Sequence, residues 1–336
     1  MTLALRLLLA FTAVGMSLPL TADSARQDAP QFRSQVIGRA VPMRVHLDGR
    51  PVSDLESHEI VLRDSGVQQE VKAIGAGRVP IDVSLVVQQT LRTQWAGKDS
   101  FRKEIREVAG LLRDGDRLRV VAAGDDVREI VPLSAPEDVG VMEPKNDTCV
   151  ALYDALASVL IRPAEPGRQH VVISMSRDEG SGSIISPEVL GQIAGRSDAL
   201  LHVLLLERDQ DRTIWRTWTR WPVCAFMFTD WSDDRRERLR QISGMPRPSE
   251  QLRALWDQQR RRLVAIADAT GGGEIRSSFF RGSIKGPVER ALNEARSGYI
   301  LYYEPRGVPE RGWHPLQITI TRPGTFEILA RAGYAY

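Results

Sequence analysis

The sequence predicts an α/β fold, in which a doubly wound and mostly parallel sheet is inserted into a discontinuous β-sandwich. Two observations predict it. Between residues 80 and 296, apolar runs typical of buried strands alternate with amphipathic helical segments, a pattern that favours parallel βαβ units. Before and after this region, shorter strands of alternating polarity are separated by turn residues. We therefore expect the two flanking β segments to pack together as one domain.

Residues 34–78 are the first part of the expected β-sandwich. Asp48-Gly49 and Asp64-Ser65-Gly66 are strong turn signals, because these residue types suit the backbone of tight hairpins. Residues 297–336 supply the second part. The strands expected in the two parts cover residues 41–47, 59–63, 67–74, 299–303, 315–321 and 326–331.

The central region supplies the sheet and its helices. Strands are expected over residues 84–89, 118–122, 170–175, 200–206 and 274–280, with residues 127–133 as an antiparallel edge strand. Ser186-Pro187 predicts a helix start, because the hydroxyl can cap the helix and proline suits its first turn. A further helix is expected from Leu263, and the glycines from Gly271 to Gly273 predict its end.

Composition and charge narrow the classes of function. The chain has 336 residues, enough for two domains, and its net charge of +2 is too small to demand a nucleic acid partner. Residues 208–262 stand apart, because they carry five of the seven tryptophans and thirteen arginines against eight acidic residues. We interpret this stretch as an insertion that follows the strand expected over residues 200–206.

The N-terminal residues resemble an export signal. Arg6 supplies a positive start, residues 7–20 are apolar, and Ala22 is a small residue at the expected cleavage point. We therefore expect residues 1–22 to be a signal peptide and the remainder to lie in the periplasm or outside the cell. The alternative is an uncleaved anchor, which is the only membrane association that the sequence predicts.

Motifs along the central region carry a family resemblance. They read SLVVQQTLR at residues 84–92, DGDRLRVV at 114–121, ALYDAL at 151–156, HVVISMS at 170–176 and ATGG at 269–272. In this order and spacing the chain resembles a von Willebrand factor A-type domain. More narrowly, it resembles the VWFA-related bacterial proteins, in which such a domain sits within a β-rich frame. The segments DGRPV, RDSGVQQEV, SGYILYYEP, ITITRPG and ILARAGYAY resemble that frame.

The resemblance also implies a divalent metal site, but this chain lacks its pattern. The family usually ends its first strand in Asp-x-Ser-x-Ser, and those positions here are Gln88, Thr90 and Arg92. The family threonine before the Ala-Leu-Tyr-Asp motif is Val150, and the aspartate of the third loop is Ser176. Because Mg²⁺ needs hard oxygen ligands that usually include a carboxylate, we expect no metal and no other cofactor.

A shifted metal site is the competing interpretation. In it, Thr148, Asp178 and Glu179 would rebuild the site one register away.

Two sets of residues are candidates for contact with a protein partner. Arg92 and Arg177 could bind a carboxylate directly, or they could be solvated loop residues. Trp215, Trp218 and Trp221 recur at intervals of three and could form an exposed aromatic ridge, or they could pack inward.

The cysteines are a separate question. Cys149 and Cys224 are both expected on the face that carries the degenerate metal positions. There they could form a disulfide, or they could remain two free thiols.

Enzyme motifs are missing from the sequence. No Gly-x-Ser-x-Gly segment is present, the five histidines are scattered, and Gly271-Gly272-Gly273 is not followed by the Lys-Ser/Thr of a phosphate loop. We therefore expect a non-catalytic, exported module for adhesion or assembly that recognises a protein partner without a metal ion. The alternatives are a metal-dependent binding protein, a structural envelope component, and an enzyme whose catalytic residues lie in the insertion.

Overall fold

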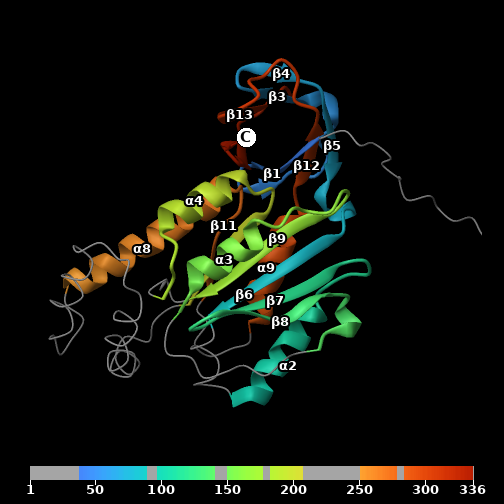
Figure 1. Cartoon of the computed structure of the whole chain (residues 1–336). Helices are drawn as coiled ribbons and strands as arrows, with labels where there is room; N and C mark the ends of the chain where they lie inside the picture. The colour runs from blue at the N-terminus through green and yellow to red at the C-terminus, as the bar shows by residue number, and fades with distance from the viewer. Residues whose placement is uncertain are drawn as a thin grey trace, which may run out of the picture. The chain divides into compact units, whose positions relative to one another are not determined.

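The computed structural model describes residues 38–88, 97–140, 150–176, 182–206, 250–277 and 284–335. Figure 1 shows three sheets in this part of the chain, together with the helices that cover the largest of them. Among the described residues, none of the helices is long and apolar enough to span a membrane.

The largest sheet has six strands in the order β11-β10-β9-β6-β7-β8. The strands are β6 (Ile81–Gln88), β7 (Arg117–Ala123), β8 (Val127–Ser134), β9 (Gln169–Ser176), β10 (Leu200–Leu206) and β11 (Gly273–Ser277). All neighbouring pairs are parallel except β7 and β8, which are antiparallel. Along the chain, β7 and β8 therefore follow β6 on one side of the sheet, and β9, β10 and β11 then follow on the other side. The strand order reverses between β6 and β9. In sheets of this kind ligands bind beyond the carboxyl ends of the strands at the reversal.

Helices cover both faces of this sheet. They are α2 (Gly97–Ala109), α3 (Leu152–Leu160), α4 (Pro187–Arg196), α8 (Glu250–Ala269) and α9 (Lys285–Arg296). One hydrophobic core joins α2 and α9 to one face, and a second joins α3, α4 and α8 to the other. Every residue of β6 and β9 is buried. The continuous apolar runs of these two strands follow from being covered on both sides.

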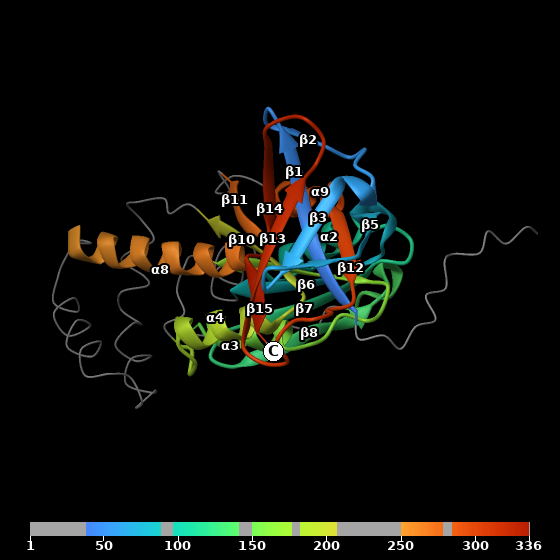
Figure 2. The same ribbon diagram turned by 90° about the horizontal axis from the view of Figure 1, so that it is seen from above.

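The two smaller sheets combine strands from both ends of the described chain (Figure 2). One has the order β14-β1-β12-β5, with β2 beside β1, and the other has the order β15-β13-β3-β4. The early strands are β1 (Arg39–Leu47), β2 (Arg50–Pro51), β3 (Ile60–Asp64), β4 (Val67–Gln69) and β5 (Val71–Gly75). The late strands are β12 (Tyr299–Tyr303), β13 (Trp313–Ile320), β14 (Phe326–Ala330) and β15 (Gly333–Ala335). We call these two sheets the β frame, because their inner faces share one hydrophobic core.

The tight turns of the β frame follow the sequence. Asp48 and Gly49 have φ angles of 52° and 73°, and Ser65 and Gly66 have φ angles of 50° and 83°. A positive φ at both central residues is the requirement of a type I′ hairpin turn. The dipeptides that predicted these turns are therefore the residues that form them.

Two expectations about element boundaries were wrong. The single strand expected over residues 67–74 is two strands, because the chain leaves β3 after β4 and joins β12 in the other sheet as β5. The buried Gln69 amide holds this crossing point through Arg306, whose N–H donates to Oε1 at 2.9 Å. The helix expected from Leu263 begins at Glu250 instead, so the last part of the expected insertion belongs to α8.

Two arginines, the partly buried Arg44 and the buried Arg331, attach the β frame to the ends of helices. Arg44 donates to the carbonyls of Gly271 and Gly272, just after α8, at 3.2 and 2.7 Å. Arg331 donates to the carbonyls of Gly195 and Ser197, at the end of α4, both at 2.8 Å. Cations are favourable at helix C-termini, where carbonyls lack helical partners. These helices run antiparallel to the parallel strands, so their C-termini lie at the amino edge of the large sheet. The β frame therefore lies at this amino edge, and the carboxyl edge of the large sheet faces away from the frame.

Candidate functional site at the carboxyl edge of the large sheet

The candidate site lies where β6 and β9 end side by side. Gln88 is the last residue of β6 and Ser176 is the last residue of β9, and the two strands are neighbours in parallel register. Val150 lies just before α3, whose N-terminus approaches the same edge. All three side chains are at most 4% exposed. The structure thus brings together the three degenerate metal positions that it describes, and it packs them into the protein.

The other predicted site residues lie outside the described residues. These are Thr90, Arg92, Thr148, Cys149, Arg177, Asp178, Glu179, Trp215, Trp218, Trp221 and Cys224. The structure therefore does not test the predicted disulfide, the aromatic ridge or the shifted metal site.

A carboxylate at this edge holds a neighbouring loop in place. Asp154, in the first turn of α3, accepts hydrogen bonds from the backbone N–H groups of Ile184 and Ile185 at 2.8 and 3.0 Å. The N–H of Tyr153 donates to Ser183 Oγ at 2.9 Å. Residues 182–185 are consequently fixed against the N-terminus of α3. Sequence reasoning read the Asp of the ALYDAL motif only as part of a family signature and missed this role.

The described part of the edge does not fit a divalent cation. Gln88 and Ser176 offer only a buried amide and a buried hydroxyl, and both oxygens of Asp154 already accept backbone N–H groups. The other carboxylates described at this edge are Asp125 and Asp126 in the exposed turn after β7, and Asp126 pairs with Arg128. A Mg²⁺ ion requires several hard oxygens, generally with a carboxylate among them. Within the described ranges, no three His, Cys, Asp or Glu side chains are grouped so that they could hold a metal.

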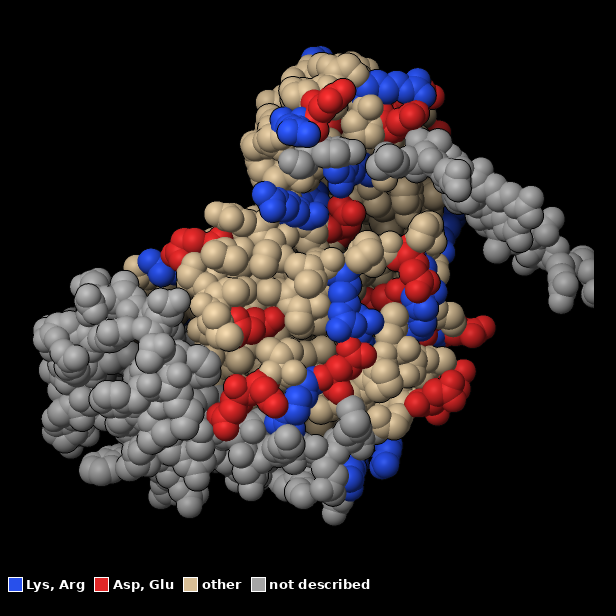
Figure 3. Space-filling model, viewed as in Figure 1, with Lys and Arg blue, Asp and Glu red and all other residues tan. Residues whose placement is uncertain are grey.

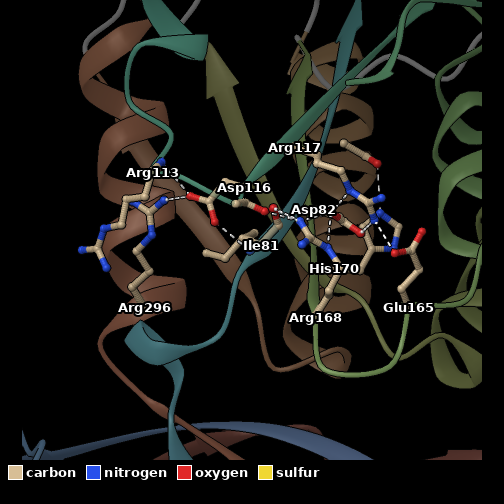
Figure 4. Close-up of polar contacts among 11 residues, drawn as sticks. Ile81, Asp82, Arg113, Asp116, Arg117, Glu165, Arg168, His170 and Arg296 are labelled. Carbon is tan, nitrogen blue, oxygen red and sulfur yellow. Dashed lines mark hydrogen bonds and ion pairs between the residues drawn. The ribbon is translucent and has the colours of Figure 1, made fainter. Parts of the chain in front are cut away.

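The opposite, amino edge carries an ion network that sequence reasoning missed (Figure 4). Asp82, near the start of β6, accepts from Arg117 Nε and Nη2 at 2.8 and 2.6 Å and from Arg168 Nε at 2.8 Å. Glu165 lies 2.9 Å from Arg117. Burial opposes the ionisation of Asp82, but the hydrogen bonds from the two arginines outweigh it and lower its pKa. The network ties the starts of three strands together.

Asp116 plays a similar part beside the network. Its carboxylate accepts from the backbone N–H groups of Ile81 and Arg113 at 2.8 and 2.9 Å and from Arg296 at 2.5 Å. In the sequence we interpreted Asp114-Gly115-Asp116 only as part of the DGDRLRVV motif. No local pattern shows that Arg296, at the end of α9, meets this loop.

Two buried histidines lie near the amino edge, one on each face of the large sheet. His170 Nε2 lies 2.9 Å from Ser84 Oγ, and burial followed by the charge of Arg119 lowers its pKa to about 4. Within the described part of the chain, His202 has no hydrogen-bond partner at either ring nitrogen. Burial and then the charge of Arg44 lower the pKa of His202 to about 3. Both imidazoles are therefore neutral at pH 7 and structural in their surroundings.

A third buried cluster closes the core of the β frame. The fully buried Asp64 accepts from the hydroxyls of Tyr303 and Tyr334 at 2.9 and 2.7 Å, and His314 Nδ1 lies 3.2 Å from the same carboxylate. Burial and the bond to Asp64 raise the pKa of Tyr334 to about 12. This cluster links β3, β12, β13 and β15, so it stabilises the packing of early strands on late strands.

Comparison with known proteins gave similarity in structure alone. No protein-family model and no curated protein matches the sequence. Proximal thread matrix protein 1 from the mussel byssus is similar with a TM-score of 0.31 and 15% identity, over 39% of this chain and 39% of that one. The present chain thus spans well under half the length of the mussel protein.

Two microbial structures are similar over more of the chain. BatB from Bacteroides thetaiotaomicron has a TM-score of 0.37 and 11% identity, over 65% of this chain and 98% of that one. VWA2, the ArnB paralog from Sulfolobus acidocaldarius, has a TM-score of 0.37 and 7% identity, over 89% and 76%. At such identities a similarity concerns fold and not function. The von Willebrand A-related fold that the sequence motifs predicted rests on the strand order of the large sheet, independently of these similarities.

Proposed function

We propose that the chain is an exported, non-catalytic module that binds a protein partner in adhesion or assembly, without a metal ion. In this proposal residues 1–22 are a signal peptide. Residues 80–296 are a von Willebrand A-like domain with a doubly wound sheet, inserted between the two parts of a β-sandwich at residues 34–78 and 297–336. The protein then acts in the periplasm or outside the cell.

The observation that carries the proposal is the use of Asp154. A metal-dependent edge would keep its oxygen donors available for the ion, whereas both carboxylate oxygens of Asp154 hold the backbone of Ile184 and Ile185. Gln88 and Ser176 are buried beside it. In its described part this edge is therefore packed and carries one fixed loop, and a surface that is rigid before binding loses less conformational entropy when a partner docks.

The position of the β frame also favours a binding surface at the carboxyl edge of the large sheet. Arg44 and Arg331 fix the frame at the amino edge, so the frame leaves the carboxyl edge for a partner. In the proposal Arg92 and Arg177 bind carboxylates of that partner, because guanidinium groups can do so without a bridging ion. Trp215, Trp218 and Trp221 add apolar contact area.

Capture of the partner with and without a chelator tests the metal-free mode. The full chain would be immobilised and incubated with envelope extract, and captured proteins would be compared in EDTA and in Mg²⁺. We expect the same partner in both. Release by EDTA, or saturable stoichiometric heat on titration with Mg²⁺ or Mn²⁺, would favour the shifted site at Asp178 and Glu179 instead.

Variants then locate the surface. Arg92→Ala with Arg177→Ala is expected to weaken capture by roughly tenfold or more, the usual loss for an interface hot spot. Arg63→Ala, an exposed arginine of the β frame, is the matched control and is expected to change little. A partner that both variants retain equally, or no specific partner at all, would argue for a structural envelope component.

A further inference from the structure

One buried histidine lies where the β frame meets the large sheet. His202, the third residue of β10, is fully buried. Arg44, from β1 of the frame, donates to the carbonyls of Gly271 and Gly272, and its Nη1 lies 2.5 Å from Glu294 of α9. The Glu294 carboxylate is also 4.0 Å from His202 Nδ1. We call Arg44, His202 and Glu294 the frame junction, because they come from three elements and meet at the attachment of the frame.

Ionised side chains hold the β frame to the rest of the described chain, and basic and acidic residues lie together there in Figure 3. Few of these charges face His202. Arg44 and Glu294 face it from β1 and α9, and the residues beside it on β9 and β11 carry no charge. Near the end of α8, Asp268 interacts with the charge of Arg44, while burial and the nearby Glu274 raise the pKa of Asp268.

Protonation of His202 would place a second cation beside Arg44. Within the described residues neither ring nitrogen of His202 has a hydrogen-bond partner. Glu294 is 4.0 Å from the imidazole but 2.5 Å from Arg44, so one carboxylate would have to serve two cations. A buried charge without a partner of its own is costly, and burial and Arg44 lower the pKa of His202 for this reason. Acid therefore favours a state in which Arg44 withdraws and water reaches the imidazolium.

We propose that the frame junction is an acid-sensitive latch, in which protonation of His202 releases Arg44 from Glu294 and from the end of α8 and detaches this corner of the β frame. The open state, with His202 in water, binds a proton near the ordinary histidine pKa of about 6.5, whereas the closed state does not. Each pH unit below that value favours opening about tenfold, so the open fraction should rise about 30-fold between pH 7.5 and pH 5. The inference goes beyond the proposed function and does not depend on it.

The second attachment of the β frame limits the opening to one corner. Arg331 there donates to the carbonyls of Gly195 and Ser197, and Asp198 lies 3.5 Å away. In the described residues, histidine is not among the hydrogen-bond partners of Arg331. Mild acid should therefore leave this attachment in place while the frame junction opens.

Hydrogen exchange at the end of α8 tests the latch in the full chain. The amides of Gly271 and Gly272 donate to the carbonyls of Asp268 and Ala267 at 2.9 and 3.2 Å, and Arg44 holds the carbonyls of the same two glycines. Release of Arg44 should fray this turn. We expect the protection of these two amides, corrected for the intrinsic exchange rate at each pH, to fall about 30-fold between pH 7.5 and pH 5.

Substitutions of the two buried histidines identify the group that titrates. His202→Leu should abolish the pH dependence at Gly271 and Gly272, and His202→Gln is a second variant without a titrating ring. His170→Leu is the matched control, because His170 is the buried histidine on the opposite face of the same sheet. It should leave the fall in protection at the two glycines unchanged, while it reduces the pH dependence of global unfolding.

Three results would overturn the inference. The first is protection at Gly271 and Gly272 that stays constant or rises in acid. The second is a pH dependence that His202→Leu and His202→Gln both retain. The third is protection equal to that of the amides of residues 171–175 at every pH, because the turn would then open only when the whole domain unfolds.

Discussion

Mild acid is expected to destabilise this protein through two buried histidines. His170 faces Ser84, Asp82 and Arg119, and His202 faces Arg44 and Glu294. Burial lowers the pKa of His170 to about 4 and that of His202 to about 3. In the unfolded chain both imidazoles titrate near the ordinary histidine value of about 6.5.

The direction and the size of the change in unfolding free energy follow from the linkage between proton binding and unfolding. Between pH 6.5 and about 4 the unfolded state binds protons that the folded state does not, so stability falls as the pH falls. At pH 5 each histidine is about 1.5 pH units below its unfolded pKa, which corresponds to about 2 kcal/mol. Together the two histidines should remove about 4 kcal/mol between pH 7.5 and pH 5, a large part of the stability of an ordinary domain.

Urea denaturation at pH 7.5, 6.5, 5.5 and 5.0 measures this loss. The His202→Leu variant should lose only about 2 kcal/mol over the same range, because one titrating group is gone. His58→Gln is the control, since His58 is 76% exposed, and it should follow the wild type. Equal pH dependence in His202→Leu and wild type would refute the reasoning, as would a wild type whose stability does not change across this range.

Three further substitutions probe the packing. Gly272→Ala places a Cβ 1.8 Å from a backbone carbonyl oxygen of β10, so it should abolish soluble folded protein. Gly286→Ala is the control, because its Cβ would meet open space, and it should be tolerated. The yield of soluble protein and its circular dichroism spectrum measure both outcomes. Asp154→Ala leaves two backbone donors without their acceptor and should cost roughly 1–3 kcal/mol, with faster amide exchange confined to residues 182–185. Asp82→Asn removes the charge that two arginines share and should cost roughly 3 kcal/mol, measured by urea denaturation.

Local patterns predicted most of the elements. The strand expected over residues 299–303 is β12, and the one over residues 200–206 is β10. The helix start at Ser186 is real, because its Oγ accepts from the N–H of Val189. The edge strand expected over residues 127–133 is β8, and it is antiparallel as predicted. Periodicity and capping chemistry are local, so one sequence carries enough information for them.

Contacts between residues far apart in the sequence could not be predicted from local patterns. Arg44 meets Gly272 across 228 positions of sequence, and Arg296 meets Asp116 across 180. Both arginines look like ordinary surface residues in the sequence, because neither lies in a motif. The strand expected over residues 67–74 is divided for the same reason. Its two halves pair with different partners, β4 with β3 and β5 with β12, and these pairings are between residues far apart in the fold.

Three of the residues predicted for the candidate site lie within the described part of the chain. Gln88, Val150 and Ser176 lie where the motif alignment placed them, at the carboxyl ends of β6 and β9 and before α3. Sequence alone did not show that Asp154 holds residues 182–185, because that contact depends on how the loop returns to the helix.

The placement of charge in the described residues supports the metal-free binding surface that we propose. A metal site concentrates oxygen donors at the carboxyl edge, where they repel one another unless a cation is bound. Here the paired carboxylates Asp82 and Asp116 lie at the amino edge instead, each neutralised by arginines. Of the described carboxylates beside the carboxyl edge, Asp154 accepts backbone N–H groups and Asp126, in the turn after β7, pairs with Arg128. In the metal-free mode that we propose, recognition at that edge would depend on side chains that contact a partner directly.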